Sequence, residues 1–180
     1  MNKLLTLVLI LLVFSCKTPE ARRPVSVKSG SFINASVERN KKLNAKEQAS
    51  IKKLMKQHEK DYIASESGFW YYYNNKIEID TLKTPVFGDI VNYNYNVKTL
   101  NGNLIYSAED IKTQTYAMDK EELFTGLREG LKLMKAGETV TFLFPSQKAY
   151  GYYGDENKIT SNTPLICEVT INSITQSQTN

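Results

Sequence analysis

Alternation of apolar and polar residues marks the second half of the chain. Residues 89–100 place apolar side chains at every second position, at Val91, Tyr93, Tyr95 and Val97. This two-residue repeat is typical of a strand with one buried face. The Asn101-Gly102 pair that follows favours a tight turn. We therefore predict a hairpin whose second strand runs through residues 104–110.

Four other segments favour strands, because they are rich in aromatic and β-branched residues. They cover residues 68–79, 113–118, 139–145 and 164–174. In the last segment Leu165, Cys167 and Val169 share an apolar face, which predicts that Cys167 points inward. Several strands, one late helix and no βαβ alternation together predict an α+β domain with a mostly antiparallel sheet.

An amphipathic helix is predicted before these strands. Asn44 and Glu47 have the spacing of a capping box, and the periodicity that follows predicts a helix over about residues 45–64. We assign residues 44–66 to this N-terminal helix and expect it to pack on the domain or on a partner. Its apolar stripe is narrow and consists of Ile51, Leu54, Met55, Tyr62 and Ile63.

A second helix is predicted between two of the strands. Asp119 and Glu122 repeat the capping-box spacing, and Gly137 is predicted to follow the end of the helix as a C′ glycine. One face of this helix is apolar and carries Leu123, Leu127, Leu131 and Met134. We expect this face to be buried against the sheet.

The first residues have the pattern of an export signal. Lys3 precedes an apolar run, residues 4–14, that is too short to cross a bilayer and fits the h-region of a signal peptide. The run leads into Val13-Phe14-Ser15-Cys16, which resembles the lipobox of bacterial lipoproteins. We expect residues 1–15 to be a lipoprotein signal peptide and Cys16 to carry lipid. An ordinary signal peptide with an incidental cysteine is the alternative.

Charge is distributed unevenly along the chain. Residues 17–60 hold 12 Lys and Arg against 4 Asp and Glu, whereas residues 61–180 hold 10 against 15. Residues 16–43 lack periodicity, and we expect them to be a flexible basic tether that can rest on anionic headgroups. A basic segment can also bind nucleic acid, but an exported protein rarely meets it, so no nucleic-acid partner is expected.

The sequence shows no arrangement typical of acid–base, nucleophilic or metal chemistry. Such chemistry needs clustered groups, and neither a Gly-x-Ser-x-Gly nor a zinc spacing is present. His58 is the sole histidine and has no cysteine nearby, so we expect no metal and no cofactor. Cys16 and Cys167 are the only cysteines, which excludes a disulfide framework if Cys16 carries lipid.

Several motifs in residues 88–174 resemble the FKBP-type peptidyl-prolyl isomerases. They are GDIVNYNY, the Asn-Gly hairpin, EELFTGLREGLKLMKAGETVTFLFPSQKAYGYYG, the loop with Ile159, and TPLICEVTINSI. With the lipobox and the N-terminal helix, the chain is similar to the FKBP-type lipoproteins associated with gliding motility. The resemblance implies a bent sheet of about five strands around one short helix over residues 67–176, followed by a polar tail at 177–180.

The resemblance also implies a substrate pocket and its residues. Phe124 falls at the position whose backbone N–H binds the substrate carbonyl, and Tyr150 falls at the position of the loop tyrosine. The positions implied as catalytic are Tyr95, Leu123, Phe124, Tyr150 and Ile159. The remaining pocket positions are Ile105, Tyr106, Tyr116, Leu127 and Cys167.

Four pocket positions depart from the family pattern. Ile105 and Cys167 replace phenylalanines, Leu127 replaces a tryptophan, and Tyr106 replaces an aspartate that accepts a hydrogen bond. The resulting pocket is expected to be wider and less aromatic. In the loop, Gly151 and Gly154 are expected to shape the turn, whereas Tyr152 and Tyr153 receive no role.

The function implied is that of a membrane-anchored prolyl isomerase in the cell envelope, facing the periplasm. Its expected partners are Xaa-Pro segments of exported proteins, its attachment is the lipid anchor, and it is expected to be a monomer, with the 44–66 helix as a site for a partner. A non-catalytic FKBP-fold chaperone or binding module is the alternative. A purely structural β-rich lipoprotein would leave the retained pocket positions unexplained.

Overall fold

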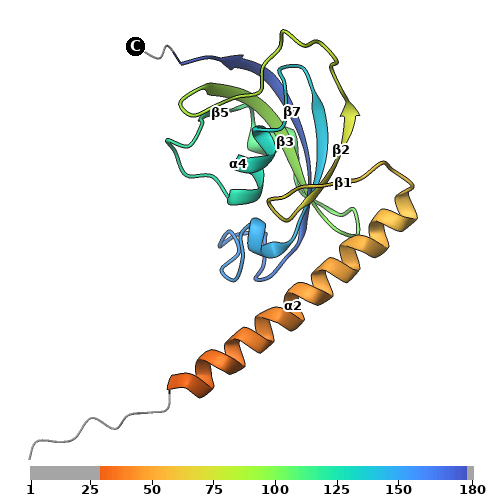
Figure 1. The fold of residues 1–180 in the computed structure, drawn as a ribbon, viewed down its shortest axis with the longest axis vertical. Coiled ribbons are helices and arrows are strands. Elements are labelled where there is room, and N and C mark those ends of the chain that lie inside the picture. Colours follow the sequence, from red (N-terminus) through yellow and green to blue (C-terminus); the bar gives the residue numbers. More distant parts are fainter. Residues whose placement is uncertain (1–28, 178–180) are drawn as a thin grey trace, which may run out of the picture. The chain divides into compact units, whose positions relative to one another are not determined.

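The fold is described from a computed structural model, in which residues 29–177 are placed (Figure 1). The expected signal peptide, Cys16, the first part of the tether and residues 178–180 lie outside the described residues. The chain divides into two compact units between Glu38 and Arg39. Within the described residues, no helix combines the length and the apolar character needed to span a membrane.

The N-terminal helix exists, but its expected boundaries are wrong at both ends. Helix α2 spans Ser29–His58, so residues 29–43, expected to be tether, are helical. No Gly or Pro interrupts residues 31–67, which explains why a helix can continue without a strong apolar period. The helix ends where Glu59 takes a positive φ of 46°. Asn44 and Glu47 therefore lie inside the helix and do not cap it.

The sheet contains seven antiparallel strands in the order β1-β2-β6-β7-β3-β4, with β5 paired to β3. The expected antiparallel α+β fold is confirmed, with more strands than the five expected. The strands are β1 (Ile63–Ala64), β2 (Trp70–Asn75), β3 (Ile90–Thr99), β4 (Leu104–Tyr106), β5 (Gln114–Ala117), β6 (Thr139–Phe144) and β7 (Leu165–Thr175).

The predicted hairpin and strand faces are present. Gly102 has a φ of +83° in the turn between β3 and β4, and the N–H of Gly102 donates to the carbonyl of Thr99 at 2.9 Å. Val91, Tyr93 and Val97 are buried along β3. Leu165, Cys167 and Val169 on β7 are also buried, so the inward direction expected for Cys167 is confirmed.

One short helix, α4 (Thr125–Leu131), packs on this sheet (Figure 1). Leu127 and Leu131 belong to the same buried cluster as residues of β3, β6 and β7. Gly130 allows α4 to approach β6 closely, because a Cβ at this position would lie 2.9 Å from the ring of Phe142 on β6. Two further helical turns, α3 (Ala108–Ile111) and η1 (Ser146–Lys148), lie in the connections.

The predicted caps of α4 are wrong. The helix begins six residues after Asp119, which has a φ of +59°. The Asp119 carboxylate pairs instead with Lys132 at 3.0 Å, so a contact within the folded domain takes the place of the cap. Gly137 has a φ of +87°, but it lies in the turn before β6 and not directly after α4.

Candidate active site

All ten pocket residues expected from the sequence lie in the buried core or pack against it. Six of them are half-buried and pack against the buried cluster: Tyr95, Ile105, Tyr106, Leu123, Phe124 and Tyr150. The other four belong to the cluster itself: Tyr116, Leu127, Ile159 and Cys167. These residues belong to β3, β4, β5, α4 and β7 and to the loops beside α4 and after η1. The two that are furthest apart in the chain, Tyr95 and Cys167, are separated by 72 positions.

Phe124 and Tyr150 form the aromatic part of this group. Their ring centroids are 5.1 Å apart, and Phe124 also meets Phe144 of β6 edge to face at 5.5 Å. Phe124 is the N-cap residue of α4, with extended dihedral angles of −60° and 139°. The first N–H groups of a helix lack partners inside it, and among residues 29–177 the N–H of Phe124 makes no hydrogen bond. This donor is therefore without a partner in the part of the chain that the structure describes.

Tyr95 is on strand β3, and its hydroxyl interacts with that of Tyr150 in the loop after η1. Burial raises the pKa of Tyr95 well above its ordinary value, and the nearby hydroxyl of Tyr150 raises that pKa further. Burial also raises the pKa of Tyr150. Both phenols are therefore neutral near pH 7 and keep the proton with which a hydroxyl donates a hydrogen bond.

The floor of the group is closed to water. Tyr116 and Ile159 are 3% exposed, and Leu127 and Cys167 are fully buried. The smaller side chains at positions 127 and 167 were expected to give a wide pocket, but no solvent reaches either of them. Burial also raises the pKa of the Cys167 thiol, so this thiol stays protonated and acts as a small apolar side chain.

Tyr106 contacts a carboxylate that the sequence reasoning missed. Its hydroxyl donates to Oδ2 of Asp155 at 2.5 Å, while Oδ1 of Asp155 accepts the N–H groups of Ile159 at 2.7 Å and Asn157 at 3.0 Å. Lys158 covers the Tyr106 ring, with its Nζ 4.8 Å from the centroid. Asp155 therefore ties the loop that carries Ile159 to strand β4.

The ionised form of Asp155 is favoured by these contacts. Burial opposes the charge, but the hydrogen bonds from Tyr106, Ile159 and Asn157 outweigh it and hold the pKa of Asp155 below its ordinary value. The hydrogen bond to Asp155 in turn raises the pKa of Tyr106. In the sequence, the only sign of this role is that Asp155 follows Gly154 in the loop.

Two glycines shape the loop as expected. Gly151 and Gly154 have φ values of +60° and +71°. A Cβ at Gly154 would lie 2.1 Å from the carbonyl oxygen of Ile159, so this turn requires glycine. Tyr152 and Tyr153 are 72% and 83% exposed and pack edge to face on each other at 5.4 Å.

Residues 82–172 match the family model described as FKBP-type peptidyl-prolyl cis-trans isomerase. This match covers half of the chain. The chain belongs to that family.

Two curated relatives of this FKBP-type chain are 29% identical to it over the aligned residues. A probable FKBP-type peptidyl-prolyl cis-trans isomerase of Haemophilus influenzae is 29% identical over 112 residues, which are 62% of this chain and 45% of the relative. The probable FKBP-type isomerase FkpA of Neisseria meningitidis is 29% identical over 87 residues, 48% of this chain and 32% of the relative. The chain thus spans less than half the length of these two relatives.

Solved structures support the FKBP-like fold. A peptidyl-prolyl cis-trans isomerase from Pseudomonas syringae aligns with a TM-score of 0.60 and 19% identity, over 76% of this chain and 96% of the other. FkpA from Escherichia coli also aligns with a TM-score of 0.60, at 20% identity, over 98% of this chain and 83% of the other.

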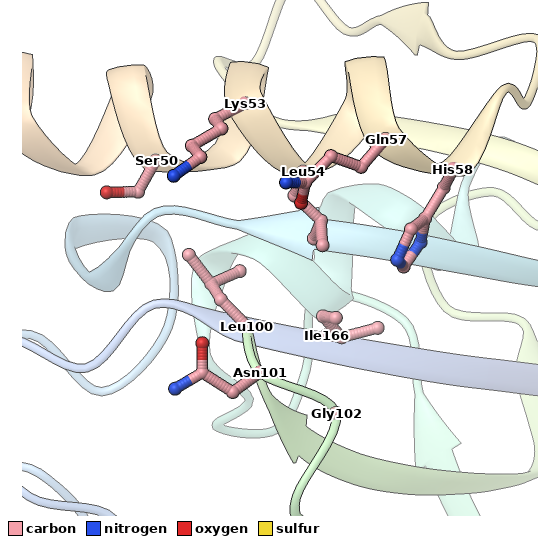
Figure 2. A pocket seen from close by; sticks show the side chains of 9 residues that line it. All are labelled: Ser50, Lys53, Leu54, Gln57, His58, Leu100, Asn101, Gly102 and Ile166. Carbon is pink, nitrogen blue, oxygen red and sulfur yellow. The ribbon is translucent and has the colours of Figure 1, made fainter.

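A separate hollow lies between α2 and the β3–β4 turn of this FKBP-type chain (Figure 2). Its volume is about 510 Å³, and its lining mixes apolar side chains such as Leu54, Leu100 and Ile166 with polar ones such as Lys53 and His58. None of the ten pocket residues lines it. Within residues 29–177, His58 belongs to no group of three or more metal-ligating side chains.

Proposed function

We propose that this chain is a peptidyl-prolyl cis-trans isomerase that acts on Xaa-Pro bonds of exported proteins. It is held in the cell envelope by lipid on Cys16 and faces the periplasm, and proteins of a gliding-motility machinery are among its clients. The observation that supports the isomerase proposal is the placement of all ten family pocket positions in one buried apolar cluster or packed against it. Membership of the FKBP-type family supports it.

The chemistry requires neither a catalytic acid or base nor a metal. Rotation about an Xaa-Pro bond meets a barrier of ~18–20 kcal/mol, which arises from amide resonance. Resonance is lost in the twisted transition state, so the carbonyl is less polar and tolerates an apolar environment better than the planar amide does. An apolar site therefore binds the twisted form more tightly. A preference of ~4 kcal/mol accelerates rotation about a thousandfold.

Each residue of the site has a task in this mechanism. Leu127, Ile159 and Cys167 are buried in the core and make the surroundings of the site apolar. The N–H of Phe124 holds a substrate carbonyl in this proposal, because it has no partner among the described residues. Tyr150 supplies a wall with its ring and a second donor with its neutral hydroxyl.

The test is an isomerisation assay on a series of Ala-Xaa-Pro-Phe peptides with the full chain in detergent micelles. Leu123→Ala combined with Tyr150→Phe should lower kcat/KM about tenfold, since one apolar contact and one hydrogen bond together contribute roughly 1–2 kcal/mol. The matched control is Leu104→Ala combined with Tyr153→Phe, the same chemical changes at exposed positions, which should leave kcat/KM unchanged.

A folded wild-type protein that accelerates none of these peptides would overturn the isomerase proposal. A non-catalytic binding module is then the second candidate, which is favoured by Leu127 and Cys167 in place of aromatic rings on the floor. Peptide-induced shifts in the NMR signals of Phe124 and Tyr150, without faster exchange between the cis and trans peptide, would support that candidate.

The anchor is tested separately. Cys16→Ser removes the only sulfur in the lipobox-like stretch, so the protein should move from the membrane fraction to the soluble fraction. Cys167→Ser changes the other cysteine in the same way and should not alter the distribution. Continued membrane association of the Cys16→Ser protein would refute lipidation as its main attachment.

A further inference from the structure

Helix α2 carries one buried carboxylate. Glu47 is 5% exposed, whereas its neighbours Lys46 and Gln48 are exposed. Ile51, one turn later on the same face, is fully buried. These two residues therefore mark the side of α2 that packs on the FKBP-type domain. Glu47 lies outside residues 82–172, the segment that matches the family model.

The partner of Glu47 is a single residue, Ser146. The Glu47 carboxylate accepts the backbone N–H of Ser146 at 2.8 Å and its hydroxyl at 2.7 Å. Ser146 is 2% exposed, so both hydrogen bonds are shielded from water. Within residues 29–177 no Lys or Arg forms an ion pair with Glu47, and the two donors of Ser146 are what compensates the buried charge.

Ser146 is also joined to the loop that carries Tyr150. It begins η1, directly after β6 and Pro145. Its carbonyl oxygen accepts the N–H of Ala149 at 2.9 Å and the N–H of Gly151 at 2.8 Å. These two amides flank Tyr150. Ser146 therefore links α2 to this loop. Its N–H and hydroxyl bind Glu47 of α2, and its carbonyl oxygen accepts from the amides on either side of Tyr150.

We infer that Glu47 is a positioning residue for the active site, through which α2 sets the place of Tyr150 opposite Phe124. Loss of the carboxylate frees Ser146, and the turn that holds Ala149 and Gly151 loosens with it. The Tyr150 ring, 5.1 Å from Phe124, then loses its fixed position over the substrate site. This inference rests on the proposed isomerase activity, because it assigns Tyr150 a role in that reaction.

The first test is the Glu47→Gln variant of the full chain. A Gln side chain keeps one acceptor oxygen but presents an N–H₂ group to the other donor of Ser146. Coupling through such a network changes rates severalfold, so kcat/KM should fall about fivefold to tenfold. Glu66→Gln, the same change at an exposed position, should leave kcat/KM unchanged. Equal rates for wild type and folded Glu47→Gln protein would overturn the inference.

A general loss of stability would also lower the rate, and two measurements separate it from positioning. In a Tyr150→Ala background, where the positioned side chain is absent, Glu47→Gln should lower kcat/KM less than twofold, whereas an undiminished loss would refute action through Tyr150. Hydrogen exchange at the amides of Ala149 and Gly151 should become faster in Glu47→Gln, with the β7 amides unchanged. Unchanged exchange at both loop amides would refute the coupling.

Ser146→Ala keeps the test decisive if Glu47→Gln does not fold. It removes only the hydroxyl and keeps the backbone N–H bond to Glu47, so a smaller loss in the same direction is expected, and none would contradict the inference. The exchange measurement does not depend on catalysis. A wild-type protein without isomerase activity would therefore refute the proposed function, while exchange at Ala149 and Gly151 would still decide whether Glu47 holds the loop.

Discussion

Gly126, the second residue of α4, offers a sharp test of how closely the site is packed. Replacing Gly by Ala inside a helix normally stabilises it by roughly 0.5–1 kcal/mol. At Gly126, however, a Cβ would lie 2.6 Å from the carbonyl oxygen of Lys148 and 2.6 Å from Cδ1 of Phe144. An ordinary contact begins at 3.4 Å, so the neighbours must move by about 0.8 Å.

The cost of this movement should exceed the helical gain. Phe144 is fully buried, and the Lys148 oxygen belongs to the backbone of η1, so neither can turn aside as a flexible side chain would. Overpacking of this kind costs about 1–3 kcal/mol. Taking the upper end, because backbone has to move, the net loss for Gly126→Ala is about 2 kcal/mol, which corresponds to a fall in Tm of roughly 4–8 °C.

Chemical unfolding followed by the fluorescence of Trp70, the only tryptophan, measures this loss. Thr125→Ala is the matched control, since Thr125 is the neighbouring helical residue and is exposed. Its free energy of unfolding should stay within about 0.5 kcal/mol of wild type. The added methyl group also pushes the Lys148 carbonyl of η1 away from α4, so kcat/KM of Gly126→Ala should fall as well. A neutral or stabilised Gly126→Ala protein would refute the close packing of α4 on Phe144 and η1.

Three further predictions concern titratable groups. Asp155→Asn should lower the free energy of unfolding by about 1–2 kcal/mol, because an amide has one acceptor oxygen for three donors. Folding lowers the pKa of Asp155, so the difference in stability between wild type and Asp155→Asn should exist above the ordinary carboxyl pKa of about 3.9. It should disappear as the pH falls through the pKa of the folded state. An equal difference at pH 7 and in strong acid would contradict this prediction. Burial raises the pKa of the Cys167 thiol, so in a Cys16→Ser protein iodoacetamide should add to Cys167 only after unfolding, as mass spectrometry would show. Because burial raises the pKa of both Tyr95 and Tyr150, kcat/KM should be flat from about pH 6 to 9, and a bell-shaped profile would require a titrating group that the mechanism lacks.

The strands could be predicted from the sequence because their pattern is local. Val91, Tyr93 and Val97 alternate with polar residues on β3, and each is buried. The helix boundaries could not be predicted in the same way. Asp119 has the spacing of a cap, but its carboxylate pairs with Lys132 across the folded domain. A contact of this kind is invisible in a local window of sequence.

The site was predicted less completely than the fold, for the same reason. The family resemblance implied ten pocket residues, and in the structure all ten lie in the buried core or pack against it. It did not indicate Asp155, whose carboxylate meets Tyr106 49 positions away. Nor did it indicate Glu47, which lies 99 positions from Ser146. Both carboxylates act through hydrogen bonds between distant segments, and their neighbours in the sequence show no trace of the partner.

The position of β7 has a consequence for the order in which the protein folds. This last strand lies in the middle of the sheet, between β6 and β3, and pairs Thr99 with Leu165 and Ile90 with Thr175. Until residues 165–175 are available, β3 and β6 keep open edges that can pair with other chains. Pairing across such distances is slow. A chain that emerges from a ribosome therefore cannot close its sheet until residue 175 has been released, so the closing of the sheet is a late folding step.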